Sequence, residues 1–241
     1  MRGLVTGVHK TGYDVLVDKK TYFCIVNNSY SASERPAVGD IALIEKEYDQ
    51  YLLKNIEERK TIIGRYDHDR NRFQVFAANV DVAFIVTSAN KEFNINRVKR
   101  FLNLISEQDI RPVVVLTKKD LADDLSPFIS QIEELEEDVD ILPINAMLPE
   151  DVMKLLNFVK RGQTMLLLGA SGVGKSTITN TLTGLNIRTQ ETQGEKHGNR
   201  GKHTTSARNL YQIPKSNGKK IIDSPGISII ATENDIPQRR R

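Results

Sequence analysis

The sequence predicts a small all-β barrel followed by an α/β domain built on a mostly parallel sheet. Three observations predict this fold class. Residues 1–60 contain short β-rich runs and no helical period, whereas from about residue 78 apolar strands alternate with helices. The stretch LLLGASGVGKSTITN, residues 166–180, joins one such strand to a helix. We place the barrel at residues 1–62 and the second domain at residues 63–241.

Composition excludes several classes of protein. The chain is 39% hydrophobic and 27% charged, and no apolar run reaches the roughly 18 residues that a membrane span needs. The N-terminus lacks the apolar core of a signal peptide. Cys24 is the only cysteine, which excludes an internal disulfide framework and fits a reducing compartment. We expect a cytoplasmic, monomeric protein with no membrane contact; its net charge of +3 says little about partners.

The barrel is predicted from five runs within about sixty residues: LVTGV, YDVLVD, TYFCIV, DIALIE and YLLKNIE. Several alternate apolar and polar residues, and turn-forming segments separate them. Closing such short strands into a barrel hides edges that would otherwise aggregate. An OB-fold is the first expectation and an SH3-like barrel the second. We interpret residues 58–73 as the link to the second domain.

The second domain is predicted from apolar runs alternating with helices, which is typical of a parallel sheet covered on both faces. The runs are DVAFIVTSA, RPVVVLTKKD, DILPINA, TMLLLGAS and KKIIDSPG. Asn94 is expected to cap a helix, Ser126 before Pro127 to open a second, and residues 150–161 to form a third. A fourth begins in the glycine-rich stretch, and two strands around KSNG form an antiparallel hairpin.

Residues 169–176, GASGVGKS, fit the phosphate-loop pattern G-x-x-x-x-G-K-[ST] between a strand and a helix. The glycines let backbone N–H groups curl around phosphates at a helix N-terminus. Lys175 is expected to reach the β- and γ-phosphates, and Ser176 to bind Mg²⁺. The predicted nucleotide contacts here are Gly169, Ala170, Ser171, Gly172, Val173, Gly174, Lys175, Ser176 and Thr177.

The segment IIDSPG supplies the next predicted part of the site. Asp223 ends an apolar run and is expected to hold Mg²⁺ through a water molecule, and the N–H of Gly226 to meet the γ-phosphate. Alone, D-x-P-G is a common turn. Its place on a strand downstream of a phosphate loop favours the functional interpretation.

The tetrapeptide TKKD, residues 117–120, is predicted to read the base. The Asp120 carboxylate can accept from guanine N1–H and from its exocyclic amine together, whereas adenine presents an acceptor at N1. Thr117 opens this motif, and Lys118 can lay its aliphatic stem over the ring. In the following INAM segment, Asn145 precedes Ala146, whose N–H is expected to meet guanine O6. Alone, TKKD would be interpreted as a solvated charged turn.

The order of these motifs is unusual, because the base-reading segments precede the phosphate loop. In a parallel sheet, only the strand ends where the loops emerge matter for the site. A circular permutation joins the old chain ends and opens the chain elsewhere, so it keeps the site while changing the order. The sequence therefore predicts a circularly permuted P-loop GTPase domain behind an OB-fold barrel.

These motifs, in this order, resemble the ribosome small-subunit-dependent GTPase A (RsgA) family. RPAVGDIAL, IEERKTIIGR, ANVDVAFIVTSAN, NINRVKRFLNLI and GNRGKHTTS carry the resemblance over nearly the whole chain. It implies binding of GTP/GDP and Mg²⁺, with Thr204 or Thr205 of switch I contacting Mg²⁺ and the γ-phosphate. It also implies GTP hydrolysis coupled to late assembly of the small ribosomal subunit, whose rRNA would be a partner.

The chain departs from the family pattern in three places. Thr117 stands where many GTPases have Asn, and Asn145 replaces the more usual Ser. The third departure concerns a helical, zinc-binding Cys/His segment, which the family carries after switch II and which the sequence does not include. Arg241 ends the chain, so it is a naturally short relative or a truncated one. With one cysteine and four histidines at no ligand spacing, we expect no zinc site.

The sequence raises one question about catalysis. No Gln follows DSPG until Gln238, so intrinsic hydrolysis is expected to be slow, with His203 as the candidate to orient water. An exposed loop histidine is the alternative. The basic stretch 194–208 could meet rRNA, although the barrel holds 9 Lys/Arg and 9 Asp/Glu in residues 1–60. Three functions are therefore considered. The first is a GTPase of small-subunit maturation, and the second is an RNA-binding assembly module that binds guanine nucleotides with little hydrolysis. The third is a P-loop kinase, which the TKKD motif disfavours.

Overall fold

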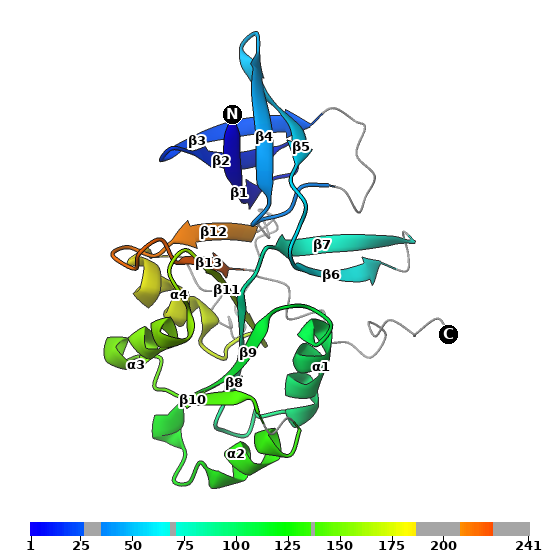
Figure 1. The fold of residues 1–241 in the computed structure, drawn as a ribbon. Helices are drawn as coiled ribbons and strands as arrows, with labels where there is room; N and C mark the ends of the chain where they lie inside the picture. Colours follow the sequence, from blue (N-terminus) through cyan, green and yellow to red (C-terminus); the bar gives the residue numbers. More distant parts are fainter. Residues whose placement is uncertain (27–34, 68–70, 136–137, 187–207, 224–241) are drawn as a thin grey trace, which may run out of the picture.

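The computed structural model describes residues 1–26, 35–67, 71–135, 138–186 and 208–223 (Figure 1). Its first five strands form the predicted barrel. They are β1 (Arg2–Val8), β2 (Tyr13–Val17), β3 (Lys20–Val26), β4 (Ile41–Glu47) and β5 (Gln50–Ile56). The pairing order is β1-β2-β3-β5-β4, and β4 returns to β1, so the barrel closes. This confirms the OB-like barrel expected from the sequence.

The barrel closes around small and branched side chains that alternate along its strands. The interior is made of Val5, Val15, Val17, Cys24, Ala42, Ile44 and Leu53. Because successive residues of a strand point to opposite faces, the intervening polar residues remain on the outside. The alternation seen in the sequence is therefore the alternation between barrel interior and solvent.

The α/β part is built on five parallel strands in the order β10-β9-β8-β11-β13. Their bounds are β8 (Val82–Ser88), β9 (Arg111–Thr117), β10 (Asp140–Pro143), β11 (Thr164–Gly169) and β13 (Lys220–Asp223). β12 (Arg208–Gln212) pairs antiparallel with β13, as the KSNG hairpin predicted, and also with β1. The whole eleven-stranded sheet is therefore mixed, because a short hairpin forces antiparallel pairing and β12 continues the sheet into the barrel.

Helices cover both faces of the parallel strands (Figure 1). In β8, Ala83 and Ile85 face the cluster that holds α1 (Ile95–Ile105) and α2 (Ser126–Glu133). Phe84 and Val86 face the opposite cluster, which holds α3 (Pro149–Met153) and α4 (Lys175–Thr183). The N-terminus of α1 is capped as predicted, with the Asn94 side chain accepting from Arg97 N at 3.1 Å. Burial on both faces explains why these strands are continuously apolar in the sequence.

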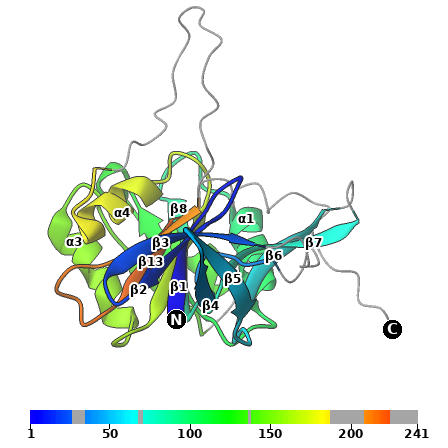
Figure 2. The same cartoon turned by 90° about the horizontal axis from the view of Figure 1, so that it is seen from above.

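Two predicted segments differ from the structure. The helix predicted at residues 150–161 is the short α3 followed by a tighter 3₁₀ turn, η2 (Lys154–Phe158). Residues 58–73, interpreted as a link, contain β6 (Ile62–Asp67), which forms a hairpin with β7 (Arg72–Ala78). Charged residues near the turn hid its alternation. Figure 2 shows this hairpin extending to one side of the molecule.

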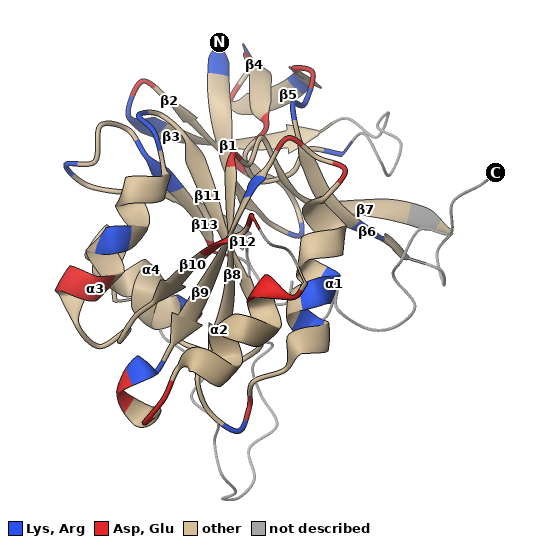
Figure 3. Cartoon of the chain, turned by 60° about the horizontal axis from the view of Figure 1, so that its bottom comes forward, with Lys and Arg blue, Asp and Glu red and all other residues tan. Residues whose placement is uncertain are grey.

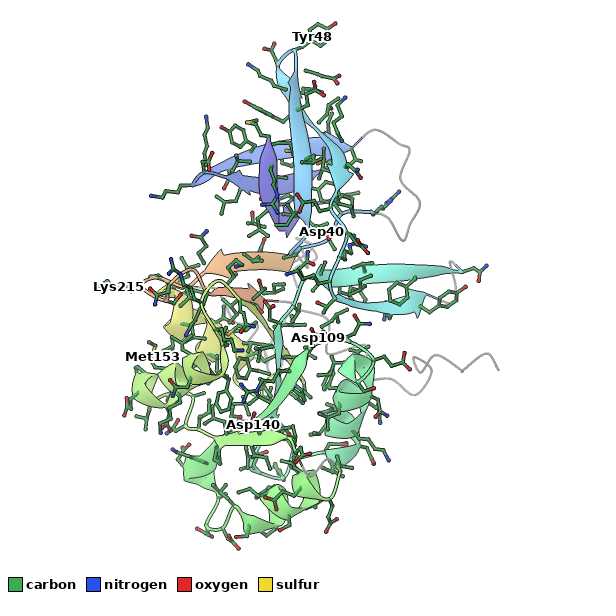
Figure 4. The ribbon with its side chains drawn as sticks, in the orientation of Figure 1. Asp40, Tyr48, Asp109, Asp140, Met153 and Lys215 are labelled. Atoms are coloured by element: carbon green, nitrogen blue, oxygen red, sulfur yellow. The ribbon has the colours of Figure 1, made fainter. Side chains whose placement is uncertain are left out.

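A buried ion pair lies beside the contact between the barrel and the residues that follow β7. Arg59 donates to the Asp40 carboxylate at 2.7 and 2.8 Å, and Asp40 is fully buried. Next to it, Gly39 N donates to Val5 O at 2.9 Å, and Asn79 Nδ2 donates to Gly39 O at 3.0 Å. Figure 4 labels Asp40 at this junction. The domain boundary at residue 62 stays a prediction. No helix within the described ranges is long and apolar enough to cross a membrane.

Candidate nucleotide-binding site

The phosphate loop lies at the point where the strand order reverses. β8 leads to β9 and β10 on one side, whereas β11 leads to β13 on the other, and β8 pairs with β11. In open α/β sheets, ligands bind outside the carboxyl ends of the strands at such a point. Residues 169–176 begin at the carboxyl end of β11 and run into α4, which places the loop there.

The loop glycines take conformations that side chains would oppose. Gly169 has φ +154°, and a Cβ there would lie 2.3 Å from Val86 O. Gly172 and Gly174 have φ values of +78° and +102°, in the left-handed region that favours glycine. The loop therefore curls as a phosphate cradle requires, with Ser171 and Gly172 exposed and Val173 buried beneath them.

Lys175 folds back into the curve of the loop. Its Nζ donates to Gly169 O at 2.8 Å and also to Ala170 O. Burial lowers the pKa of Lys175 to about 8, although the nearby Asp223 carboxylate opposes this shift. An ammonium among backbone carbonyls and N–H groups at a helix N-terminus suits a polyphosphate, whose oxygens would replace the carbonyls as partners.

Hard oxygen donors flank the phosphate loop. Ser176 and Thr177 are half-buried in the first turn of α4, and Asp223, 9% exposed, ends β13. Since β13 is parallel to β11, the end of β13 and the phosphate loop lie at the same edge of the sheet. A hydroxyl and a carboxylate are suited to Mg²⁺, which prefers oxygen ligands and keeps several of its waters. This donor set fits the implied metal.

Thr117 ties the base-reading loop to the phosphate loop. It ends β9, is fully buried, and lies 2.8 Å from Val173 O and 3.0 Å from Thr87 O through its hydroxyl oxygen. The hydroxyl has one hydrogen, which it donates to these two carbonyls. The threonine that replaces the more usual asparagine thus still links the two loops, although 56 residues separate Thr117 from Val173.

The rest of the TKKD loop presents its carboxylate to solvent. Lys118 has φ +58° and its ammonium contacts the Glu92 carboxylate at 3.1 Å. That ammonium lowers the pKa of Glu92. Asp120 is exposed in the 3₁₀ turn η1 (Lys119–Leu121) and makes no hydrogen bond or ion pair with the described residues. A free carboxylate beside an anchored lysine stem is what guanine recognition requires.

The second base loop follows β10 and lies beside the phosphate loop. A Cβ added at Gly174 would lie 3.5 Å from the Ala146 Cβ and 3.8 Å from Thr117 Cγ2. Asn145 and Ala146 are both half-buried. Three segments that are far apart in the sequence, residues 117–120, 145–146 and 169–176, therefore converge at one edge of the sheet.

Some predicted site residues lie outside the described residues. These are His203, Thr204, Thr205 and Gly226, together with the basic residues Lys196, Arg200 and Lys202 of the stretch 194–208. Their proposed roles stay predictions. Two contributors went unnoticed in the sequence: Glu92, which anchors Lys118, and Asp151, which contacts both base loops. Asp151 lies in the first turn of α3. Acidic residues are common at this position because they interact favourably with the helix dipole, so no pattern in the sequence assigned Asp151 to the site.

Comparison with known proteins decides the family. A family model described as RsgA GTPase matches residues 56–233. The chain belongs to the RsgA GTPase family. The small ribosomal subunit biogenesis GTPase RsgA 2 of Vibrio vulnificus (strain CMCP6) is 36% identical over 221 residues, covering 91% of this chain and 60% of that protein. The RsgA of Methanosarcina acetivorans is 32% identical over 231 residues, covering 94% and 62%. The chain thus spans about three fifths of these RsgA relatives.

Solved structures agree with this fold. YjeQ from Thermotoga maritima has a TM-score of 0.68 at 21% identity, covering 95% of this chain and 76% of that one. YloQ, a circularly permuted GTPase, has a TM-score of 0.61 at 23% identity, covering 94% and 71%. These similarities confirm the permuted fold expected from the motif order, and the RsgA family match confirms the resemblance found in the sequence.

Proposed function

We propose that this chain is a GTPase that binds the small ribosomal subunit and couples GTP hydrolysis to its late maturation. One observation carries the proposal: the Thr117 hydroxyl donates to Val173 O and ties the first base loop to the phosphate loop, and Gly174 lies close to Ala146 of the second. Relatives of this chain are named small ribosomal subunit biogenesis GTPases, which supports the choice of partner.

Each loop has a distinct role in this proposal. Asp120 and the Ala146 N–H select guanine, and the Lys118 stem covers the ring. Residues 169–177 hold the phosphates, with the Lys175 ammonium on the β- and γ-oxygens. Ser176 and Asp223, with Thr204 or Thr205, would hold Mg²⁺, which when bound neutralises charge on the transferred phosphate. Gly226 meets the γ-phosphate in the same scheme.

Slow intrinsic turnover is part of the proposal. Ras-like enzymes orient the attacking water with a Gln shortly after the glycine that meets the γ-phosphate. Here the apolar Ile227 follows Gly226 instead. We assign His203 to orient the attacking water once the subunit is bound. The basic stretch 194–208 would contact rRNA phosphates. Figure 3 shows both basic and acidic residues on the barrel, in line with the 9 Lys/Arg and 9 Asp/Glu of residues 1–60, so the barrel carries no net basic charge. We propose that the protein acts as a cytoplasmic monomer.

GTP turnover with and without saturating small subunits, at low and high salt, tests the proposal. Subunits should accelerate turnover, and the stimulation should fall steeply as salt rises, because phosphate contacts release counterions. Replacing Lys196, Arg200 and Lys202 with Ala should reduce stimulation while leaving GDP affinity nearly unchanged. A charge-matched control replaces the exposed Lys99, Lys160 and Arg161.

Two results would redirect the proposal. Turnover that saturating subunits leave unchanged at low salt would favour the RNA-binding assembly module with little hydrolysis. Equal stabilisation by ADP and GDP would remove the guanine assignment, since at ~100 times its Kd only the bound nucleotide adds about 2.7 kcal/mol to the free energy of unfolding.

A further inference from the structure

The Asp151 carboxylate is a buried group that the proposed function leaves unassigned. Asp151 lies in α3, is 3% exposed, and is followed by Val152, whose side chain is part of the core beside α4. Its oxygens accept from three donors: Asn145 N at 2.8 Å, Lys119 Nζ at 2.6 Å and Lys154 Nζ at 2.5 Å. The Asn145 N–H and both ammonium groups hold the pKa of this carboxyl well below its usual range. The carboxylate is therefore ionised at neutral pH.

Two of these three donors belong to the base-reading loops. Asn145 lies in the loop after β10, and Lys119 lies beside Asp120 in the loop after β9. The direct backbone contact between these loops, from Lys119 N to Ile144 O, is longer, at 3.3 Å. Because Val152 anchors α3 in the core, Asp151 gives both loops a common fixed point.

The N–H groups around Ala146 show what this fixed point achieves. Asn145 N donates to Asp151, Met147 N donates to Asn145 Oδ1 at 2.9 Å, and Leu148 N donates to Asn145 O at 3.0 Å. Within the described part of the chain, the Ala146 N–H meets no acceptor. The N–H groups on either side of Ala146 are therefore hydrogen-bonded within the protein, and the Ala146 N–H is left for a ligand. The carboxylate of Asp120 is likewise without a partner among described residues.

We propose that Asp151 is a positioning residue for guanine recognition, which fixes Asn145 and Lys119 so that the Ala146 N–H and the Asp120 carboxylate meet the same base. The proposal rests on the proposed function, because it names what aligns the two halves of that base site. Asp151 itself does not touch the nucleotide. Lys154, the third donor, belongs to η2 and to neither base loop.

The test compares three ligands on the full chain: GDP, 6-thio-GDP and inorganic pyrophosphate. Sulfur replaces O6 in 6-thio-GDP and accepts a hydrogen bond only weakly, so this ligand reports on the Ala146 N–H. Pyrophosphate reports on the phosphate loop alone. Asp151→Ala should weaken GDP binding roughly tenfold, bring the ratio of the two Kd values for GDP and 6-thio-GDP close to one, and leave pyrophosphate binding unchanged. Lys154→Met, the matched control, should keep every Kd within about twofold of wild type.

Two outcomes would overturn the proposal. Unchanged GDP affinity in Asp151→Ala would show that the base loops need no such anchor. An equal loss for GDP and pyrophosphate would show that Asp151 merely supports the fold around α3 and α4. If Asp151→Ala does not fold, Asp151→Asn keeps the side-chain volume and one acceptor oxygen, and the same comparison applies to it. Failure of wild type to bind GDP would refute the proposed function instead, so the two failures are distinguishable.

Discussion

Replacing Thr117 with valine should weaken both the fold and the nucleotide site, because its hydroxyl joins the base loop to the phosphate loop. Valine keeps the shape of threonine but removes the donor. The carbonyl of Val173 then loses the partner 2.8 Å away, and Thr87 O the one 3.0 Å away. Thr117 is 0% exposed, so water does not replace the lost hydroxyl at its own position.

The magnitude follows from this burial. Leaving a buried polar group unsatisfied costs about 1–3 kcal/mol. In a protein of this size, 1 kcal/mol lowers Tm by roughly 2–4 °C, so Thr117→Val should melt roughly 2–12 °C below wild type. If about 1.4 kcal/mol of the loss acts on the phosphate loop, the Kd for GDP rises about tenfold.

Thr179→Val is the matched control. Thr179 is also 0% exposed, but its hydroxyl donates to Lys175 O at 3.1 Å within a single turn of α4 and joins no second loop. Its removal should change GDP affinity less than about twofold. Thermal melting of the nucleotide-free protein and calorimetric titration with GDP measure both effects. Thr117→Val binding GDP as tightly as wild type, or Thr179→Val losing as much affinity, would refute the idea that Thr117 links the loops.

Three further predictions concern single residues. Burial lowers the pKa of Lys175 to about 8 from 10.5, so between these two pH values the unfolded chain binds more protons than the folded one. The free energy of unfolding of the nucleotide-free protein should therefore rise with pH across that window. Urea denaturation at several pH values measures this rise, which should be flatter in Lys175→Met. Gly39→Ala should lower the free energy of unfolding by about 1–3 kcal/mol, because φ is +96° and the new Cβ would lie 2.1 Å from Ala78 O. Gly162→Ala is the control, since a Cβ there would have nothing within 4 Å, and it should cost less in the same urea experiment. Asp120→Asn should shift preference from guanine to xanthine nucleotides, whose C2 carbonyl offers an acceptor to the new amide; a variant that still prefers GDP over XDP in a competition assay would contradict the base assignment.

The sequence predicted those features that depend on neighbouring residues. Alternation along several barrel strands, continuous apolar runs in the parallel strands and the Asn94 cap are local patterns, and the structure contains all three. The phosphate loop was predictable for the same reason, since its glycines, lysine and serine all lie within residues 169–176. The hairpin β6–β7 was missed because the many charged residues between Ile63 and Phe73 obscured the alternation of its strands.

The sequence alone determined which residues could bind a nucleotide and that their motifs share one edge of the sheet, and the tertiary structure decided which contacts hold those motifs together. The motifs for the base and the phosphates meet because β8 pairs with β11. No pattern of residues along the chain indicates that these two strands are neighbours. The bond from Thr117 to Val173 and the three donors on Asp151 depend on it as well. Contacts between distant segments arise from strand order and helix packing, which act through space rather than along the chain. The physical reason is that a periodic pattern records which face of an element is buried, whereas it does not record the neighbour that buries it.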